Sequence, residues 1–317
     1  MHKLAASVSV LALAALSLVG CAAADSTDCT PVSQASESTQ KLVTATGEVG
    51  TAPDVEVLTP IHVSKGVSWQ PVTGEGTPVT SLGQVVGIDL SLFNGTSGDA
   101  VFESSYDPSS PQLFTLTGLD QTLPGVADLL ECAQAGSRVI FTLPAKGFAP
   151  ETLAGFQLTD SDTLVGVVDV HDVYLARANG ADQFHTGTGL PSVVRAPDGQ
   201  PGVVVPDSAA PTDTVVQVVK KGDGAEVEAD SLVLVHYTAV RWNDRELVGS
   251  TWNDASPAGV QPSAGSQPFA ADLEGQTVGS QVMVIVPSGG EESGGGDADA
   301  TIYVVDILGI APAQTGQ

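Results

Sequence analysis

Side chains that could make or break covalent bonds are few and scattered in this sequence. His62, His171, His185 and His236 lie far apart, and no two have metal-ligand spacing. The sequence has no G-x-S-x-G turn for a nucleophilic serine and no Walker loop for phosphates. We therefore expect no metal ion and no cofactor, and any site has to act by shape, apolar surface and hydrogen bonds.

Acidic residues dominate the charge of the chain. It has 37 Asp and Glu against 11 Lys and Arg, a formal net charge of −26 over 317 residues. Such a surface repels phosphate backbones, so nucleic acid is not expected as a partner. The run SGGEESGGGDADA, residues 288–300, is interpreted as an acidic loop, because its carboxylate spacing does not fit an EF-hand calcium site.

The N-terminal segment MHKLAASVSVLALAALSLVGC has a lysine, an apolar stretch and a cysteine, which is typical of a secretory signal at residues 1–20. Its end, LVGC, resembles the bacterial lipobox. The resemblance implies cleavage before Cys21, a lipid on the Cys21 sulfur, and an exported protein anchored to the outer face of the bacterial cell membrane. The alternative is an ordinary signal with a chance cysteine.

Two cysteines remain once Cys21 carries a lipid. Outside the cytoplasm such a pair usually forms a disulfide, so we expect a bridge between Cys29 and Cys132. Two buried free thiols are the alternative.

Composition divides the rest of the chain. Residues 21–40 are polar without a hydrophobic period, which predicts a flexible, lipidated tether. Residues 181–214 are rich in Pro and Gly, which predicts a stiff linker. Two domains, 41–180 and 215–317, are left on either side of that linker.

The two domains share sequence signals in the same order. VTGEGTPV parallels KKGDGAEV, AGSRVIFTLP parallels VGSQVMVIVP, TLVGVVDV parallels TIYVVDIL, and Asp89 aligns with His236. Matches in one order indicate a duplicated domain.

Each copy reads as strand, hairpin, short helix, strand, long loop and strand. That order predicts an α+β fold, in which a twisted antiparallel sheet packs on one short helix. The helix of the first copy is expected over residues 123–134, with Pro124 in its first turn. A pair of β-sandwich modules would lack such a helix. The residues expected to form its buried face are Val126, Leu129, Leu130 and Ala133.

These segments resemble the FKBP-type peptidyl-prolyl isomerases. The resemblance rests on KKGDGAEV, LVLVHYTAV, GQTVGSQVMVIVP and YVVDILGI in the second copy, and on VFESSY and LPGVADLLECAQAGSRVIFTLP in the first. It implies two FKBP-like domains, each with an apolar pocket for a proline ring.

The resemblance assigns pocket residues copy by copy. In the second copy it places Tyr237 and Tyr303 on strands, Phe269 at the floor and Val248 at a wall where the family has phenylalanine. Gly249 replaces the family's aspartate there.

In the first copy the resemblance assigns Phe102, Glu103 at the aspartate place, Leu123, Val126 at the floor and Phe148 in the loop. Leu90 and Gly166 replace family aromatics. The first copy keeps more of the family's motif, which favours it as the better-preserved pocket.

The implied activity is cis–trans isomerisation of X-Pro bonds in unfolded or Pro-containing segments of exported proteins. It needs no nucleophile, because an apolar pocket can favour the twisted amide. The incomplete aromatic walls leave open a second class, a non-catalytic peptide-binding or chaperone lipoprotein. They also leave open that these aromatic side chains are only core residues and that Glu103 is only a solvated acid.

Overall fold

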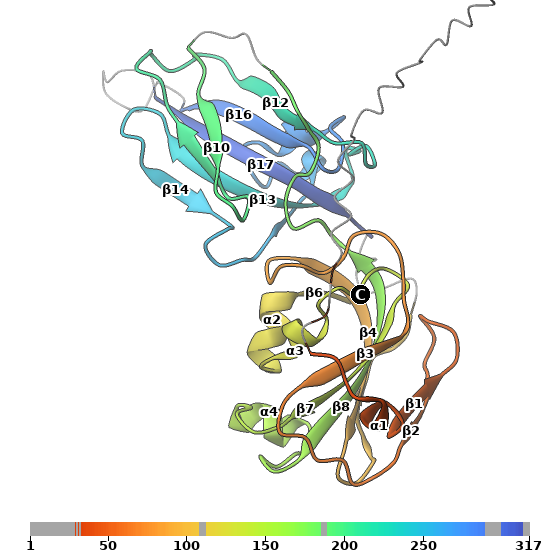
Figure 1. The fold of residues 1–317 in the computed structure, drawn as a ribbon. Helices are drawn as coiled ribbons and strands as arrows, with labels where there is room; N and C mark the ends of the chain where they lie inside the picture. Colours follow the sequence, from red (N-terminus) through yellow and green to blue (C-terminus); the bar gives the residue numbers. More distant parts are fainter. Residues whose placement is uncertain are drawn as a thin grey trace, which may run out of the picture.

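The computed structural model describes residues 29, 31, 33–107, 112–184, 189–288 and 299–312. Two domains, each centred on an antiparallel sheet, follow one another along the chain (Figure 1). In the first, the strands run in the order β3-β7-β8-β4-β5, with β6 also beside β4. These strands are β3 (Val67–Val72), β4 (Val85–Asn94), β5 (Ala100–Glu103), β6 (Gln112–Thr115), β7 (Arg138–Pro144) and β8 (Thr163–Val173).

The sheet of the second domain has the order β14-β13-β17-β16-β12-β9, with β15 also beside β13. Without β9 this is the strand order of the first domain, so the predicted duplication is also present in the topology. The strands are β9 (Ala181–Asp182), β12 (Val215–Lys221), β13 (Leu232–Arg241), β14 (Leu247–Ser250), β15 (Ala258–Val260), β16 (Gln281–Ser288) and β17 (Asp299–Ala311).

The register of the central strand pair is the same in both domains. Asp89 pairs with Asp169 between β4 and β8, and His236 pairs with Asp306 between β13 and β17. The alignment of Asp89 with His236 made from the sequence is therefore confirmed by the ladder.

Helical turns cover one face of each sheet, which we name the helix-side face. In the first domain these are α2 (Leu116–Thr122) and α3 (Val126–Leu129), shown in yellow in Figure 1, with α4 (Pro150–Gly155) in the long loop. In the second domain they shrink to the 3-10 turns η1 (Pro262–Ala264) and η2 (Ala270–Leu273). The fold is mostly strands with few helices.

The helix expected over residues 123–134 has other bounds in the structure. The longer helix, α2, ends before Leu123, because a residue that precedes proline disfavours the helical conformation. Gly125 then adopts a left-handed conformation, with φ of 92°, before the single turn of α3. The apolar side chains expected on the buried face are nevertheless buried: Val126, Leu129, Leu130 and Ala133.

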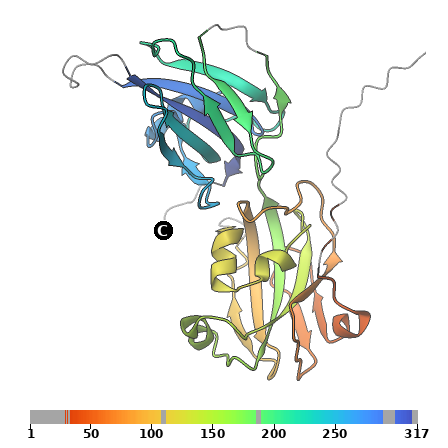
Figure 2. The ribbon, with the colours of Figure 1, turned by 60° about the vertical axis from the view of Figure 1, so that its left-hand side comes forward.

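A short hairpin covers the opposite, hairpin-side face of each sheet. Strands β1 (Val43–Thr46) and β2 (Asp54–Val57) pack over β7 and β8 of the first domain, on the side away from α2 and α3 (Figure 2). Strands β10 (Ser192–Arg195) and β11 (Pro201–Val204) pack over β16 and β17 of the second.

The β10–β11 hairpin corrects the predicted linker. Residues 192–204 fall within the segment expected as an extended connector, 181–214. They instead fold back at a Pro-Asp-Gly turn, in which Gly199 has a φ of 102°. Prolines mark both stiff connectors and tight turns, so the composition alone did not separate them. The second domain therefore begins before residue 215.

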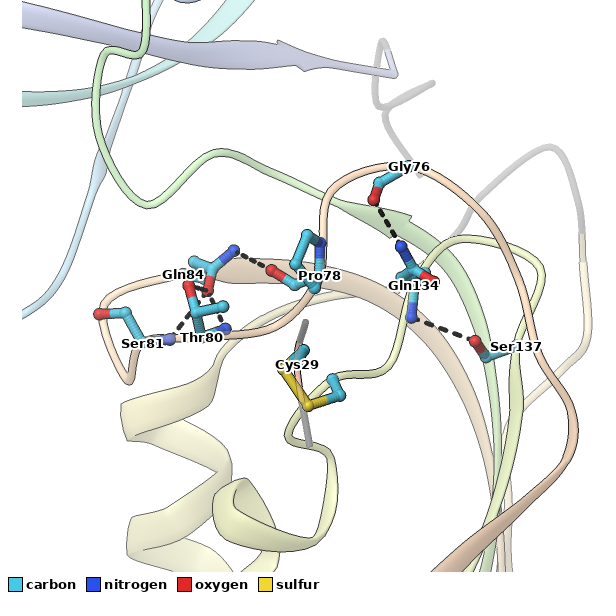
Figure 3. Close-up of a disulfide and its surroundings, with 9 residues drawn as sticks. Cys29, Gly76, Pro78, Thr80, Ser81, Gln84, Gln134 and Ser137 are labelled. Atoms are coloured by element: carbon cyan, nitrogen blue, oxygen red, sulfur yellow. Dashed lines mark hydrogen bonds between the residues drawn. A yellow bond between two sulfur atoms is a disulfide. The ribbon is translucent and has the colours of Figure 1, made fainter. Parts of the chain in front are cut away.

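The predicted tether also becomes part of the first domain before residue 41. The segment around Gln34 pairs with β3 at Ser68, and the short helix α1 (Glu37–Gln40) leads into β1. Cys29 forms the expected disulfide with Cys132, with a Cα–Cα distance of 5.4 Å (Figure 3). The predicted signal at 1–20 and Cys21 lie outside the described residues. Among the residues that are described, no helix is long and apolar enough to cross a membrane.

Reduction of the disulfide should destabilise the first domain selectively. The bridge joins residues 103 positions apart. Chain entropy alone gives such a loop about 4–5 kcal/mol of stabilisation. Denaturant unfolding with and without reductant should show a loss of up to that size in the transition of the first domain. An equal shift of the second domain's transition would contradict this assignment.

An ion pair is completely buried in the first domain. The Arg138 guanidinium binds both carboxylate oxygens of Asp169 at 2.6 Å, and the two side chains are 1% and 0% exposed. Arg138 also donates to the carbonyls of Gly47 and Glu48, while Asp169 accepts from the Gly50 N–H at 2.7 Å. The pair therefore fastens the turn of the β1–β2 hairpin to the sheet.

Removing Arg138 should leave the buried carboxylate of Asp169 without its charged partner. We expect Arg138→Met to lower the unfolding free energy of the first domain by about 3–5 kcal/mol, the usual cost of breaking a buried pair. The double variant with Asp169→Leu removes both charges and should recover part of the loss. Denaturant unfolding measures both variants. A loss of under about 1 kcal/mol in the single variant would show that the pair does not hold the hairpin.

Candidate functional site

Three aromatic side chains of the second domain meet on its helix-side face. The ring of Phe269 lies 5.4 Å from that of Tyr237 and 5.2 Å from that of Tyr303, measured between centroids. Phe269 is 0% exposed and forms the floor, while both tyrosines are half-buried. The sequence assigned all three to one pocket, and the structure brings them together.

Strand alternation and a helical turn place these rings. Tyr237 lies on β13 opposite Val305, and Tyr303 lies on β17 opposite Ala239. Phe269 precedes η2, whose Ala270 and Leu273 are buried in the same core. Because alternate residues of a strand face one side, His236 and Val304 point away from this core.

The rim of the aromatic cluster is apolar and open. Val248, assigned to a wall, lies on β14 and is 45% exposed. A side chain at Gly249 would begin 3.6 Å from the Tyr237 ring and 3.8 Å from its hydroxyl. A carboxylate at this position would be within reach of the hydroxyl, and glycine leaves that space empty.

The two phenols share one environment. Burial, and next the neighbouring Tyr237, raise the pKa of the Tyr303 hydroxyl above its usual range. The Tyr303 phenol thus stays protonated at neutral pH and can donate a hydrogen bond. The cluster is therefore a neutral aromatic surface with hydroxyl donors at its edge.

The first domain has none of these aromatic side chains at the matching positions. Leu90 takes the place of Tyr237, Val126 that of Phe269 and Gly166 that of Tyr303. A side chain at Gly166 would begin 2.2 Å from the ring of Phe141, so that ring already fills the space. Phe141 faces Gly166 across the β7–β8 ladder.

The residues assigned to the first pocket lie mostly inside the core. Leu123, Val126 and Phe148 are 2%, 2% and 6% exposed and pack in one cluster with Leu90. Phe102 lies at the margin, 38% exposed, with its ring 6.4 Å from that of Phe156.

Strand register shifts the VFESS alignment by one residue. Both β5 and β14 carry a bulge, at Val101 and at Val248. Phe102 therefore matches Gly249, the place of the family's aspartate, and exposed Glu103 matches Ser250. The two bulges lie at matching positions, so the offset that joins Asp89 to His236 also joins Phe102 to Gly249.

Sequence reasoning missed Phe141 and Phe156, which fill the helix-side face of the first domain. Phe141 could have been found from the alternation along residues 138–144, which places it on the same face as Val139 and Leu143. No pattern indicated Phe156, because it ends the short helix α4 in a loop.

No metal site is present among the described residues, where no three His, Cys, Asp or Glu side chains converge. Of the acidic loop 288–300, only residues 288, 299 and 300 are described.

No family model and no curated protein matches the chain. Solved structures that match it include the three FKBP domains of wheat FKBP73, with a TM-score of 0.31 and 14% identity over 78% of this chain and 94% of that one. FkpA from Escherichia coli matches with a TM-score of 0.28 and 16% identity over 40% of this chain and 54% of that one. The N-terminal domain of FKBP42 from Arabidopsis thaliana matches with a TM-score of 0.27 and 21% identity. The match covers 35% of this chain and 99% of that one. These structures are FKBP-type proteins.

The residue beside Tyr237 faces the other domain. His236 is 2% exposed, its ring stacks on Trp252 with centroids 4.3 Å apart, and Nδ1 lies 2.9 Å from the Thr251 hydroxyl. Burial lowers the pKa of His236 to about 4, although a hydrogen bond with the backbone of Gly83 opposes this. The ring is therefore neutral at physiological pH.

The stability of the second domain should depend on His236. Its pKa is near 6.5 when unfolded and about 4 when folded, so its contribution is fully present above pH 6.5 and is lost as pH falls toward 4. Unfolding free energies measured between pH 7 and 4 should fall less steeply for His236→Gln than for the unaltered chain. Equal slopes would show that His236 does not titrate as described.

Proposed function

We propose that the second domain binds proline-containing segments on the Tyr237–Phe269–Tyr303 cluster and catalyses cis–trans isomerisation of their X-Pro bonds. The observation that carries the proposal is the convergence of three aromatic rings, two of them half-buried and one fully buried. A proline ring is apolar and compact, so it can lie between the two tyrosine rings, over the buried Phe269.

An apolar site suits this reaction because the barrier is electronic. Rotation about a peptide bond costs ~18–20 kcal/mol, since the C–N bond has partial double-bond character. The planar amide is the more charge-separated state, and water stabilises it. A site that excludes water and fits the twisted amide lowers the barrier without covalent chemistry. The phenol hydroxyls would orient the substrate carbonyl.

The burial pattern favours the second domain over the first, which reverses the ranking suggested by sequence. The assigned residues of the first domain are packed against one another and against α4, and Phe141 fills the space at Gly166. We propose that the first domain has a structural role and does not catalyse the isomerisation.

A non-catalytic peptide-binding role is the second candidate, and the rim favours it. Val248 is exposed and Gly249 leaves the Tyr237 hydroxyl without a carboxylate partner at that position. Such an open rim can hold an apolar segment without forcing the amide out of plane. In either role we place the protein outside the cytoplasmic membrane, held by a lipid on Cys21, with unfolded segments of exported proteins as partners.

Variants of the full-length chain can separate these roles. Phe269→Leu keeps much of the apolar volume and should lower kcat/KM for a Pro peptide about tenfold, or about 1.4 kcal/mol of transition-state stabilisation. Tyr237→Phe keeps the ring and should lower kcat more than binding. Phe148→Leu in the first domain is the matched control and should leave kcat/KM unchanged.

Protease-coupled turnover and peptide titration would be measured on the same preparations. Peptide binding that Phe269→Leu weakens, together with no turnover above the uncatalysed rate, would replace the enzyme by the binding role. Turnover that Phe148→Leu lowers and Phe269→Leu spares would overturn the assignment to the second domain.

A further inference from the structure

A hollow of about 1230 Å³ lies in the first domain, away from the aromatic cluster. Strands β1 and β3 form two of its sides, and Ile140 and the Cys29–Cys132 disulfide border it. Figure 3 shows Cys29 in the same region as Gly76, Pro78 and Gln134, which also line the hollow. The disulfide holds one wall in place.

Among the described residues that line the hollow, none has an ionisable side chain apart from the bridged cysteines. This is unusual in a chain with 37 acidic residues. The floor has the half-buried Trp69, and the walls carry amide side chains, including Gln34, Gln70 and Gln134. An uncharged surface of this kind suits a neutral polar or apolar ligand, because a charge there would lose water without gaining a partner.

The edges of two strands face the hollow. All four residues of β1, Val43–Thr46, line it, as do residues 68–71 of β3. Successive side chains of a strand point to opposite faces, so four in a row can line one hollow only where the backbone edge borders it. Such edges carry N–H and C=O groups that can pair with another strand.

The ladder shows which groups of β1 point outward. The Leu58 N–H donates to the Leu42 carbonyl, so 42/58, 44/56 and 46/54 are the hydrogen-bonded pairs. Ala45, opposite Val55, therefore turns its N–H and C=O away from β2 and toward the hollow. Within the described residues, no hydrogen bond to these groups of Ala45 is found.

The chain itself already adds a strand to the neighbouring edge. The Ala35 N–H donates to the Ser68 carbonyl, and the Ser68 N–H donates to the Ser33 carbonyl. The edge of β3 is thus able to accept an extended segment, and Pro31 and Gln34 of this segment also line the hollow.

We propose that this hollow binds an extended, uncharged polypeptide segment of another protein, added as a strand to the free edge of β1. Backbone pairing makes the recognition independent of most side chains, while the uncharged walls exclude charged segments. The site is separate from the aromatic cluster and does not depend on isomerase activity.

The test uses the full-length chain and a proline-free probe. An end-blocked peptide of alternating threonine and valine, labelled with a neutral dye, should bind saturably by fluorescence anisotropy. The same peptide with aspartate at every second position should bind at least tenfold more weakly. Hydrogen exchange should show new protection at Ala45 when the neutral peptide is added.

Three variants, one of them a control, examine the edge and the lining separately. Ala45→Pro removes the outward N–H and should weaken binding at least tenfold, whereas Val55→Pro removes an N–H from the far edge of the same hairpin and should not. Gln70→Glu adds a charge at nearly constant shape. It should weaken binding of the neutral peptide several-fold and strengthen that of a peptide with one lysine.

Equal binding of the neutral peptide by Ala45→Pro and the unaltered chain would overturn the proposal. The absence of saturable peptide binding would also overturn it. A neutral oligosaccharide that displaces the peptide without protecting the Ala45 amide from hydrogen exchange would overturn it as well. Protection at Ala45 that rises with protein concentration alone would instead identify a second copy of this chain as the occupant.

Discussion

Each domain depends on one buried carboxylate in its last central strand. A charge can lie in a protein interior only if it is paired and its hydrogen bonds are satisfied. Asp169 meets this constraint with Arg138 and with the turn of the β1–β2 hairpin. Asp306 meets it with Gln281 at 2.6 Å and with the N–H of Ala178 at 2.8 Å. In both domains the acid therefore fixes a segment that lies N-terminal to the sheet.

The two copies satisfy the same requirement with different chemistry. Gln281 replaces Arg138 in the second domain. Arg195, from the β10–β11 hairpin, donates from Nη2 to the side-chain oxygen Oε1 of Gln281 at 2.9 Å. A neutral amide stabilises a carboxylate less than a guanidinium does, and burial raises the pKa of Asp306 to about 6. Because Ala178 lies in the segment that joins the domains, its hydrogen bond to Asp306 also fixes that segment to the second domain.

The helix-side faces of the two domains differ in which of two neighbouring strands carries the large side chain. Phe141 and Gly166 form a cross-strand pair in the first domain, and Val284 and Tyr303 form the same pair in the second. The total size changes little, so either arrangement fills the core. The choice decides where the aromatic ring lies. In the second domain the ring, Tyr303, is half-buried beside Tyr237 and above the buried Phe269, and in the first domain the ring, Phe141, is 0% exposed.

The sequence by itself determined the duplicated domain, because its strand signals repeat in the same order. The count of cysteines beyond the expected signal determined the Cys29–Cys132 pairing. The resemblance to FKBP-type proteins, not the periodicity, placed Tyr237, Phe269 and Tyr303 in one pocket. It misplaced the helix expected over residues 123–134 and the hairpin at 192–204, since breaks at Pro-Gly and turns shift bounds without changing composition. The alignment to the family motif also placed Phe102 one residue away from its structural match, Gly249. Only the tertiary structure decided which pocket is filled. Burial of Leu123 and Phe148 depends on residues far away in sequence, such as those of α4, and no local pattern records that packing.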